Sequence, residues 1–205
     1  MRFLFAFFLV AGLLIHPSTA DPTPAVDSVS YGFDDANSTM TLYGSSNVRD
    51  WTMDVSVLNG TVLLSETDAA LPAIQKIDVT VPVAKVVSDK DKLQRHAHDA
   101  LKKEEYPVIS FTSTDVQVAA AEADTFSVSA TGDLTIAGET QTITLTAKGA
   151  QTDDGLTVVG AHRLKLSTYN VERPSLFFGA IKVTDPVRLA FDVRLTSSSN
   201  TASGE

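Results

Sequence analysis

Apolar and polar residues alternate one for one through most of the chain from residue 40 onward. The longest run covers residues 126–136, where Phe, Val, Ala, Gly, Leu and Ile face one way and mainly Ser and Thr face the other. A period of two residues is typical of antiparallel sheets that bury one face and wet the other. Similar runs recur and predict about eight strands, an all-β fold that a sandwich or a closed barrel would satisfy.

The pattern does not decide between a filled interior and a hollow one. It also leaves Asn59-Gly60 open, because this dipeptide is typical of a hairpin turn but also fits a bulge in one longer strand. The apolar side of the other runs comprises Met40, Leu42, Trp51, Met53, Val55, Val62, Leu64, Ile77, Val79, Val81, Ile109, Phe111, Ile143, Leu145, Ala147, Leu156, Val158, Leu164, Val187, Leu189, Phe191, Val193 and Leu195.

Residues 89–104 form a segment in which the apolar positions follow a helical period instead. Leu93, Ala97 and Leu101 recur at every fourth position and fall on one helix face, while charged residues cover the others. Pro107 ends the helix, because the residue before a proline is pushed towards extended conformations. The sequence therefore predicts one amphipathic helix among many strands.

Residues 1–20 have the pattern of a secretory signal peptide. Arg2 supplies a basic start, residues 3–15 are almost continuously apolar, and small residues precede the expected cleavage between Ala20 and Asp21. The apolar run is shorter than the ~20 residues of a membrane-spanning helix. We therefore expect a periplasmic or secreted protein without stable membrane insertion.

The rest of the chain reads as one β-domain over residues 28–196, with a mobile leader at 21–27 and a disordered tail at 197–205. The chain contains no cysteine, so an exported domain of this kind must be stable on its core alone. Its formal net charge is −9 at pH 7, which disfavours nucleic acid and anionic membranes as partners.

The sequence offers little chemistry. His96 and His98 stand two residues apart, so on a helix they point to different faces and make a poor metal pair. No nucleophile with a neighbouring base, no phosphate loop and no cofactor motif is apparent. We expect neither catalysis nor a cofactor nor a metal site.

Several segments together resemble the YceI-like family of exported bacterial proteins, in order and spacing, over roughly residues 28–195. Each segment is weakly specific by itself, but the combination is specific. They are VRDWT at 48–52, HAHDALKKEEYPVISF at 96–111, GDLTIAG and QTITL within 132–145, and, less closely, FGAIK at 178–182 with the strand at 187–193.

The resemblance implies a lipocalin-like antiparallel eight-stranded β-barrel, with the helix packed across it and no catalytic motif. It also implies a long apolar ligand inside the barrel, a polyisoprenoid or a fatty-acid derivative. The alternative is a filled β-domain that serves as a structural, interaction or stress-protective module without ligand; a homodimer is compatible with either. Strand parity then predicts an apolar binding wall of Trp51, Met53, Ile109, Phe111, Phe126, Val128, Leu134, Ile143, Leu166, Phe177 and Phe178.

Overall fold

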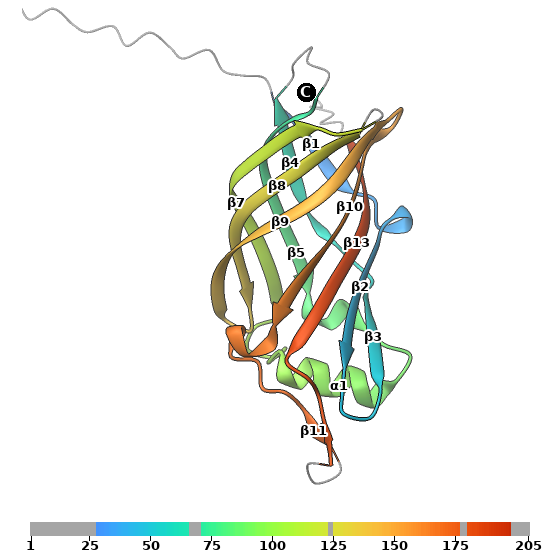
Figure 1. The fold of residues 1–205 in the computed structure, drawn as a ribbon, viewed down its shortest axis with the longest axis vertical. Helices are drawn as coiled ribbons and strands as arrows, with labels where there is room; N and C mark the ends of the chain where they lie inside the picture. Colours follow the sequence, from blue (N-terminus) through green and yellow to red (C-terminus); the bar gives the residue numbers. More distant parts are fainter. Residues whose placement is uncertain (1–27, 66–70, 123–124, 177–179, 198–205) are drawn as a thin grey trace, which may run out of the picture.

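The computed structural model describes residues 28–65, 71–122, 125–176 and 180–197, and Figure 1 shows their arrangement. The helices are α1 (Asp91–Ala100) and the short 3-10 helices η1 (Asp35–Asn37), η2 (Val83–Lys85) and η3 (Leu166–Tyr169). The strands are β1 (Ser28–Phe33), β2 (Thr39–Ser45), β3 (Asp50–Val55), β4 (Asn59–Ser65), β5 (Ala73–Pro82), β6 (Val86–Val87), β7 (Val108–Ala120), β8 (Thr125–Ile136), β9 (Glu139–Thr152), β10 (Gly155–Lys165), β11 (Ser175–Leu176), β12 (Ile181–Lys182) and β13 (Pro186–Ser197).

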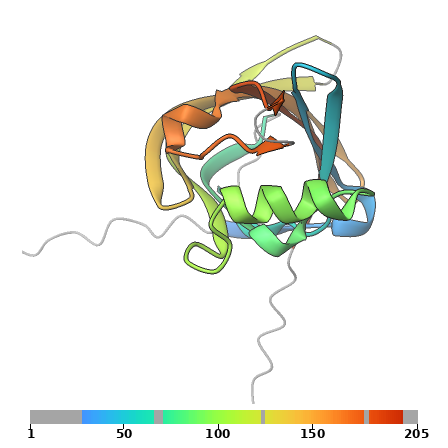
Figure 2. The same cartoon turned by 90° about the horizontal axis from the view of Figure 1, so that it is seen from below.

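Eight of these strands close into a barrel. They follow the order β1-β4-β5-β7-β8-β9-β10-β13, every neighbouring pair is antiparallel, and β13 pairs back with β1 to complete the ring. The ring is visible in Figure 2, which looks at the barrel from its lower end. The prediction of an antiparallel eight-stranded barrel with one helix is confirmed, and the sandwich is excluded.

Three wall strands are interrupted at the same level. The first is β1-η1-β2, which runs beside β13. The second consists of β3 and β4, which pair with β2 and β1. The third is β5, which continues through η2 into β6. The breaks bond to one another: the Leu58 amide donates to the Asp35 carboxylate at 2.9 Å, and the Ser56 amide donates to the Lys85 carbonyl at 2.9 Å. Each pair of short strands therefore acts as one long strand, and neighbours in the wall are neighbours in the chain.

This arrangement corrects the hairpin that Asn59-Gly60 suggested. The dipeptide begins β4, and β4 pairs with β1 and β5 rather than with β3. Gly60 has a φ of +145°, and a Cβ there would overlap the carbonyl oxygen of Asp78 on β5. The glycine thus permits the close start of β4 after the interruption at residues 56–58, where no reversal occurs.

Helix α1 lies across the lower end of the barrel (Figure 2). Leu93 and Ala97 pack against the cluster that contains Met53, while Leu101 packs with Ile136 in a neighbouring cluster. The apolar face that the sequence predicts is therefore the face that docks. Within the described part of the chain, no helix combines the length and the apolar character that crossing a membrane requires.

The helix is shorter at its C-terminal end than the predicted 89–104. Regular helix stops at Ala100, because Lys102 has a left-handed φ of +52° and the Lys103 amide donates to the His98 carbonyl at 3.0 Å. These contacts form a helix-ending motif well before Pro107. His98 also bonds to the barrel wall, since its Nε2 lies 2.9 Å from the carbonyl oxygen of Val86 on β6.

Candidate ligand cavity in the barrel

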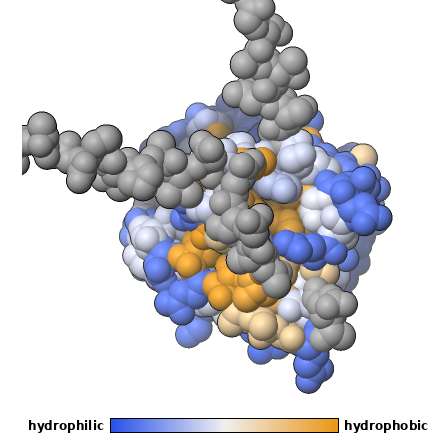
Figure 3. All heavy atoms as spheres, turned by 90° about the horizontal axis from the view of Figure 1, so that it is seen from above, coloured by the Kyte–Doolittle hydropathy of each residue, from blue (hydrophilic) through white to orange (hydrophobic). Residues whose placement is uncertain are grey.

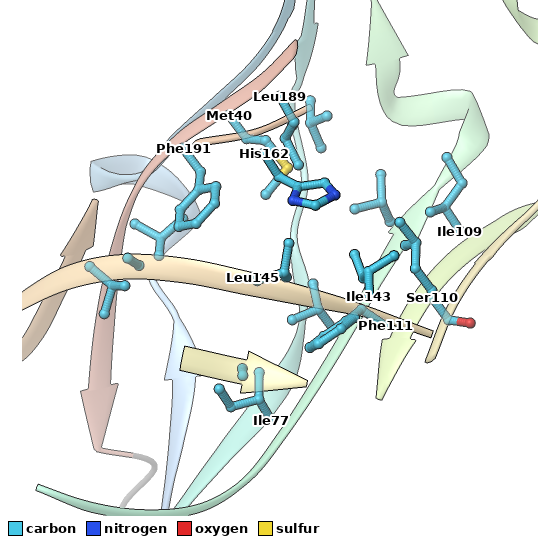
Figure 4. Close-up of a pocket in the computed structure, with 18 of the residues that line it drawn as sticks. Met40, Ile77, Ile109, Ser110, Phe111, Ile143, Leu145, His162, Leu189 and Phe191 are labelled. Atoms are coloured by element: carbon cyan, nitrogen blue, oxygen red, sulfur yellow. The ribbon is translucent and has the colours of Figure 1, made fainter. Parts of the chain in front are cut away.

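The barrel encloses a cavity of about 210 Å³. Each strand of the barrel wall, from β1 to β10 and β13, contributes at least one side chain to the lining, and Figure 4 shows part of it. The lining comprises Phe33, Met40, Leu42, Val55, Val62, Ile74, Ile77, Val79, Val81, Val86, Ile109, Ser110, Phe111, Val128, Ala130, Leu134, Ile136, Ile143, Leu145, Ala147, Val158, His162, Leu164, Leu189, Phe191, Val193 and Leu195.

The cavity extends along much of the barrel. On β5 alone the lining runs from Ile74 to Val81, which corresponds to about 23 Å of strand at about 3.3 Å per residue. An apolar protein cavity of about 150 Å³ is sufficient to bind benzene. The space in this barrel is therefore both larger than a single ring requires and elongated, which suits a chain better than a compact molecule.

The lining is apolar with two exceptions, Ser110 and His162. The hydroxyl of Ser110 points away from the group of side chains around the cavity, whereas the imidazole of His162 points into that group (Figure 4). His162 is half-buried, and burial lowers the pKa of its imidazole. Its side chain is thus the polar element of the cavity.

Five of the predicted wall residues line the cavity. They come from β7, β8 and β9, which pair side by side in this part of the barrel. They are Ile109, Phe111, Val128, Leu134 and Ile143. Phe177 and Phe178 lie outside the residues that the structure describes.

Trp51 and Met53 lie on the same side of β3 as Val55, but only Val55 lines the cavity. A Cβ on Gly44 would overlap the indole ring of Trp51, and the indole N–H donates to the Ser45 carbonyl at 3.2 Å. Met53 is 3% exposed and packs with Leu58 and its neighbours in a solid cluster. Both side chains support the wall beneath the docked helix.

Phe126 and Leu166 occupy opposite ends of the barrel. Phe126, near the start of β8, is 2% exposed, and its ring covers Gly149, where a Cβ would overlap it. Leu166 belongs to η3 and packs against the cluster of Ile136 and Tyr169. Phe126 points inward from its strand as predicted, whereas Leu166 lies in η3 and not on the predicted strand; neither side chain lines the cavity.

Much of the lining is absent from the predicted wall, including all the lining residues of β2, β5, β10 and β13. Met40, Leu42, Leu189 and Phe191 all lie on the apolar side of their strands. Parity therefore indicated their direction, but their depth in the barrel depends on the pairing of β2 with β13. His162 was missed because a lone histidine in a strand carries no distinctive signal.

The wall changes character between β9 and β10. Their pairing begins at Thr152↔Gly155 and ends at Ala147↔Gly160, although β9 starts at Glu139 and β10 continues to Lys165. In Figure 1 the two strands diverge below this point. The stretches of β9 and β10 that no longer pair with each other still line the cavity. They contribute Ile143 and Leu145 from β9, and His162 and Leu164 from β10.

The two ends of the barrel are covered differently. Below, α1 and η3 lie across the opening (Figure 2). Above, Figure 3 shows apolar surface gathered near the centre of the barrel end.

Among residues 28–65, 71–122, 125–176 and 180–197, no group of three or more His, Asp or Glu side chains is placed to hold a metal ion.

A closed antiparallel barrel whose neighbouring wall strands follow one another in the chain, with an elongated apolar cavity and one helix at its end, has the architecture of a lipocalin-like barrel. A sequence model of the YceI-like domain matches residues 31–195. The chain belongs to the YceI-like family, as its sequence motifs indicated.

Relatives and solved structures agree with this assignment. Protein YceI of Escherichia coli O6:H1 is 36% identical over 83 residues, which are 40% of this chain and 41% of that protein. A polyisoprenoid binding domain from Saccharophagus degradans superposes with a TM-score of 0.64 at 16% identity, over 82% of this chain and 99% of that one. BcnA of Burkholderia cenocepacia superposes with a TM-score of 0.62 at 23% identity, over 78% of this chain and 98% of that one.

The sequence match to Protein YceI spans about two fifths of that relative's length, and the structural matches at these identities show the fold.

Proposed function

We propose that this protein is a binding or carrier protein that holds one long apolar or amphiphilic molecule, a polyisoprenoid or a fatty-acid derivative, inside its barrel. The observation that carries the proposal is the elongated cavity of about 210 Å³ with an almost wholly apolar lining. The likeness to a structure named a polyisoprenoid binding domain supports the choice of ligand class.

The energetics favour such a ligand over a polar one. Each methylene that leaves water for an apolar site contributes about 0.8 kcal/mol, so a dozen buried methylenes contribute about 10 kcal/mol before the entropy loss of association. A polar molecule would instead lose its hydrogen bonds to water in a cavity where only His162 could replace them. Tight binding therefore needs no polar recognition motif.

Extraction of the purified, folded protein with organic solvent, followed by mass spectrometry, tests this function. We expect an apolar compound in near-stoichiometric amount. Leu145→Trp should lower the amount because Leu145 lines the cavity, whereas Thr144→Trp should leave it unchanged because the side chain of Thr144 is on the outer face. A parent protein that contains no extractable ligand and binds none would support the filled module instead.

No reaction is part of the proposal. The lining contains a single titratable residue, His162, and the hydroxyl of Ser110 points away from it (Figure 4). A nucleophile and a base within hydrogen-bonding reach, the minimum for most hydrolytic chemistry, are therefore not assembled in the lining. Binding and release are the activities that this cavity supports.

The proposal includes export of the protein to the periplasm or the medium. It rests on the pattern of residues 1–20, with cleavage between Ala20 and Asp21. Intact-mass measurement on protein from the cell envelope should give a chain that begins at Asp21. A chain that keeps Met1 and stays with the membrane would contradict export.

A further inference from the structure

His162 is the titratable residue in the cavity lining, and its imidazole points inward (Figure 4). It pairs in register with Leu189 on β13, and the labelled side chains nearest to it in the view are Met40, Leu189 and Leu145. No hydrogen bond joins the imidazole to any other described residue, and burial is the cause of its lowered pKa. A polar side chain thus stands among apolar ones, with ring nitrogens that a ligand in the cavity can reach.

The surroundings of His162 contain no charge to balance an ionic ligand. The cavity lining includes no Lys, Arg, Asp or Glu. The neighbouring Arg163 lies on the opposite side of β10 and is exposed, as the alternation of the strand requires. A carboxylate or phosphate drawn into the cavity beside His162 would therefore be desolvated without a paired cation, which is strongly unfavourable.

His162 also stands where the wall is least continuous. The pairing of β9 with β10 ends at Ala147↔Gly160, two residues before it. Beyond that point His162 and Leu164 face the cavity from one strand, and Ile143 and Leu145 face it from the other. A ligand whose apolar chain fills the barrel would place its polar end best here, beside the one side chain of the described lining that points a polar group into the cavity, and next to strand edges that do not pair with each other.

We propose that His162 hydrogen-bonds to the polar end of the ligand, and that this end is an uncharged carbonyl or hydroxyl group. The inference rests on the proposed function, because it assigns an orientation and a head-group class to a ligand in the same cavity. A neutral imidazole has one N–H donor and one acceptor nitrogen, so it serves a carbonyl or a hydroxyl equally well. Both groups can enter an apolar site without bringing a charge.

The test measures dissociation constants on delipidated full-chain protein, by displacement of the fluorescent probe N-phenyl-1-naphthylamine. The competitors share a twelve-carbon chain: dodecane, dodecan-1-ol, dodecan-2-one and dodecyl phosphate. The variant is His162→Phe, which keeps a ring in the lining but removes the hydrogen bond. Leu164→Phe is the matched control, because Leu164 lines the cavity two residues further along the same strand.

The readout is the dissociation constant of dodecanol or the ketone divided by that of dodecane. This ratio cancels general effects of the substitution on the apolar chain. In His162→Phe it should rise about 2- to 12-fold over the parent, the equivalent of one hydrogen bond. His162→Gln should recover part of the difference, and Leu164→Phe should leave the ratio within twofold of the parent.

Three results would overturn the assignment. An unchanged ratio in His162→Phe would remove His162 from head-group binding. Tighter binding of dodecyl phosphate than of dodecanol to the parent would show a charged head group. Failure of every probe to bind, dodecane included, would refute the apolar cavity itself, so the loss of the proposed function is distinguishable from the loss of this inference.

Discussion

The upper end and the middle of the barrel interior both have inward side chains from alternating strand positions, but these side chains pack at the upper end and line a cavity in the middle. At the upper end, Phe126 and Leu156 are each 2% exposed and Leu64 is 8% exposed, and the three pack in one cluster, which we call the filled end. In the middle, Ile143 and Leu145 also point inward but are half-buried, because their tips face the cavity.

The difference shows that inward direction and packing are separate properties. Phe126 and Ile143 occupy equivalent inward positions on neighbouring strands, β8 and β9. Phe126 lies opposite Gly149, whose missing side chain leaves room for the ring, so that space is filled. Further down, Ile143 lies opposite Gly132 on β8, where the β7 backbone and the Phe111 ring take the space over the glycine, and Ile143 itself lines the cavity. Substitutions at the filled end should therefore mainly change the free energy of unfolding, and substitutions in the cavity should mainly change ligand binding.

The largest expected effect is at the filled end. Phe126→Ala should lower the free energy of unfolding by about 3–5 kcal/mol, because it leaves a void among packed neighbours. The composition of the extracted ligand should change little, since Phe126 lies outside the cavity lining. Denaturant unfolding of delipidated protein measures the loss; a small loss together with an altered ligand would place Phe126 in the binding wall after all.

A matched pair of enlargements should separate the two regions at intermediate size. Leu156→Trp inserts volume into the filled end and should destabilise the protein by about 1–3 kcal/mol, the usual range for overpacking. Leu145→Trp places the same side chain in the cavity and should be tolerated with a smaller loss in delipidated protein. Equal shifts of the two denaturation midpoints would mean that the middle of the barrel is as filled as its end.

The smallest expected effect is a pH dependence at His162. Because burial lowers the pKa of the folded imidazole below its ordinary value of 6.5, the folded state resists the proton that the unfolded chain accepts. Stability from this residue is complete above about pH 6.5 and is lost as the pH falls through the folded pKa.

The check compares denaturation midpoints of the parent and His162→Gln between pH 7.5 and pH 5 in delipidated protein. The parent should lose more stability than the variant over this range. The lowered pKa of Asp185, caused first by the hydrogen bond from the Ser167 amide, acts in the same direction only near or below its ordinary pKa of 3.8. Identical profiles for the two proteins would show that His162 is not buried in apolar surroundings.

Much of the fold could be predicted from the sequence, because alternation and helical period report directly on which side chains are covered. The apolar side predicted for residues 126–136 is the inward side of β8, and the predicted apolar face of α1 is its docked face. The end of α1 could not be predicted, since a lysine at position 102 gives no signal for a left-handed residue.

The site was predicted only in part, for a physical reason. Size and strand parity predict Trp51, Met53 and Phe126 as wall residues, but whether a large inward side chain packs or lines a cavity depends on its partners across the barrel. Those partners are set by register, by glycines such as Gly149 and by the early end of the β9–β10 pairing. None of these is contained in a local pattern.

Diffraction from xenon-pressurised crystals of the delipidated protein would show whether the barrel is hollow below its filled end. Xenon enters preformed apolar cavities and is seen as a strong electron-density peak. We expect xenon among Ile143, Leu145, Leu189 and Phe191, and none between Phe126, Leu64 and Leu156. A barrel that takes up no xenon, with side chains packed across its middle, would contradict it.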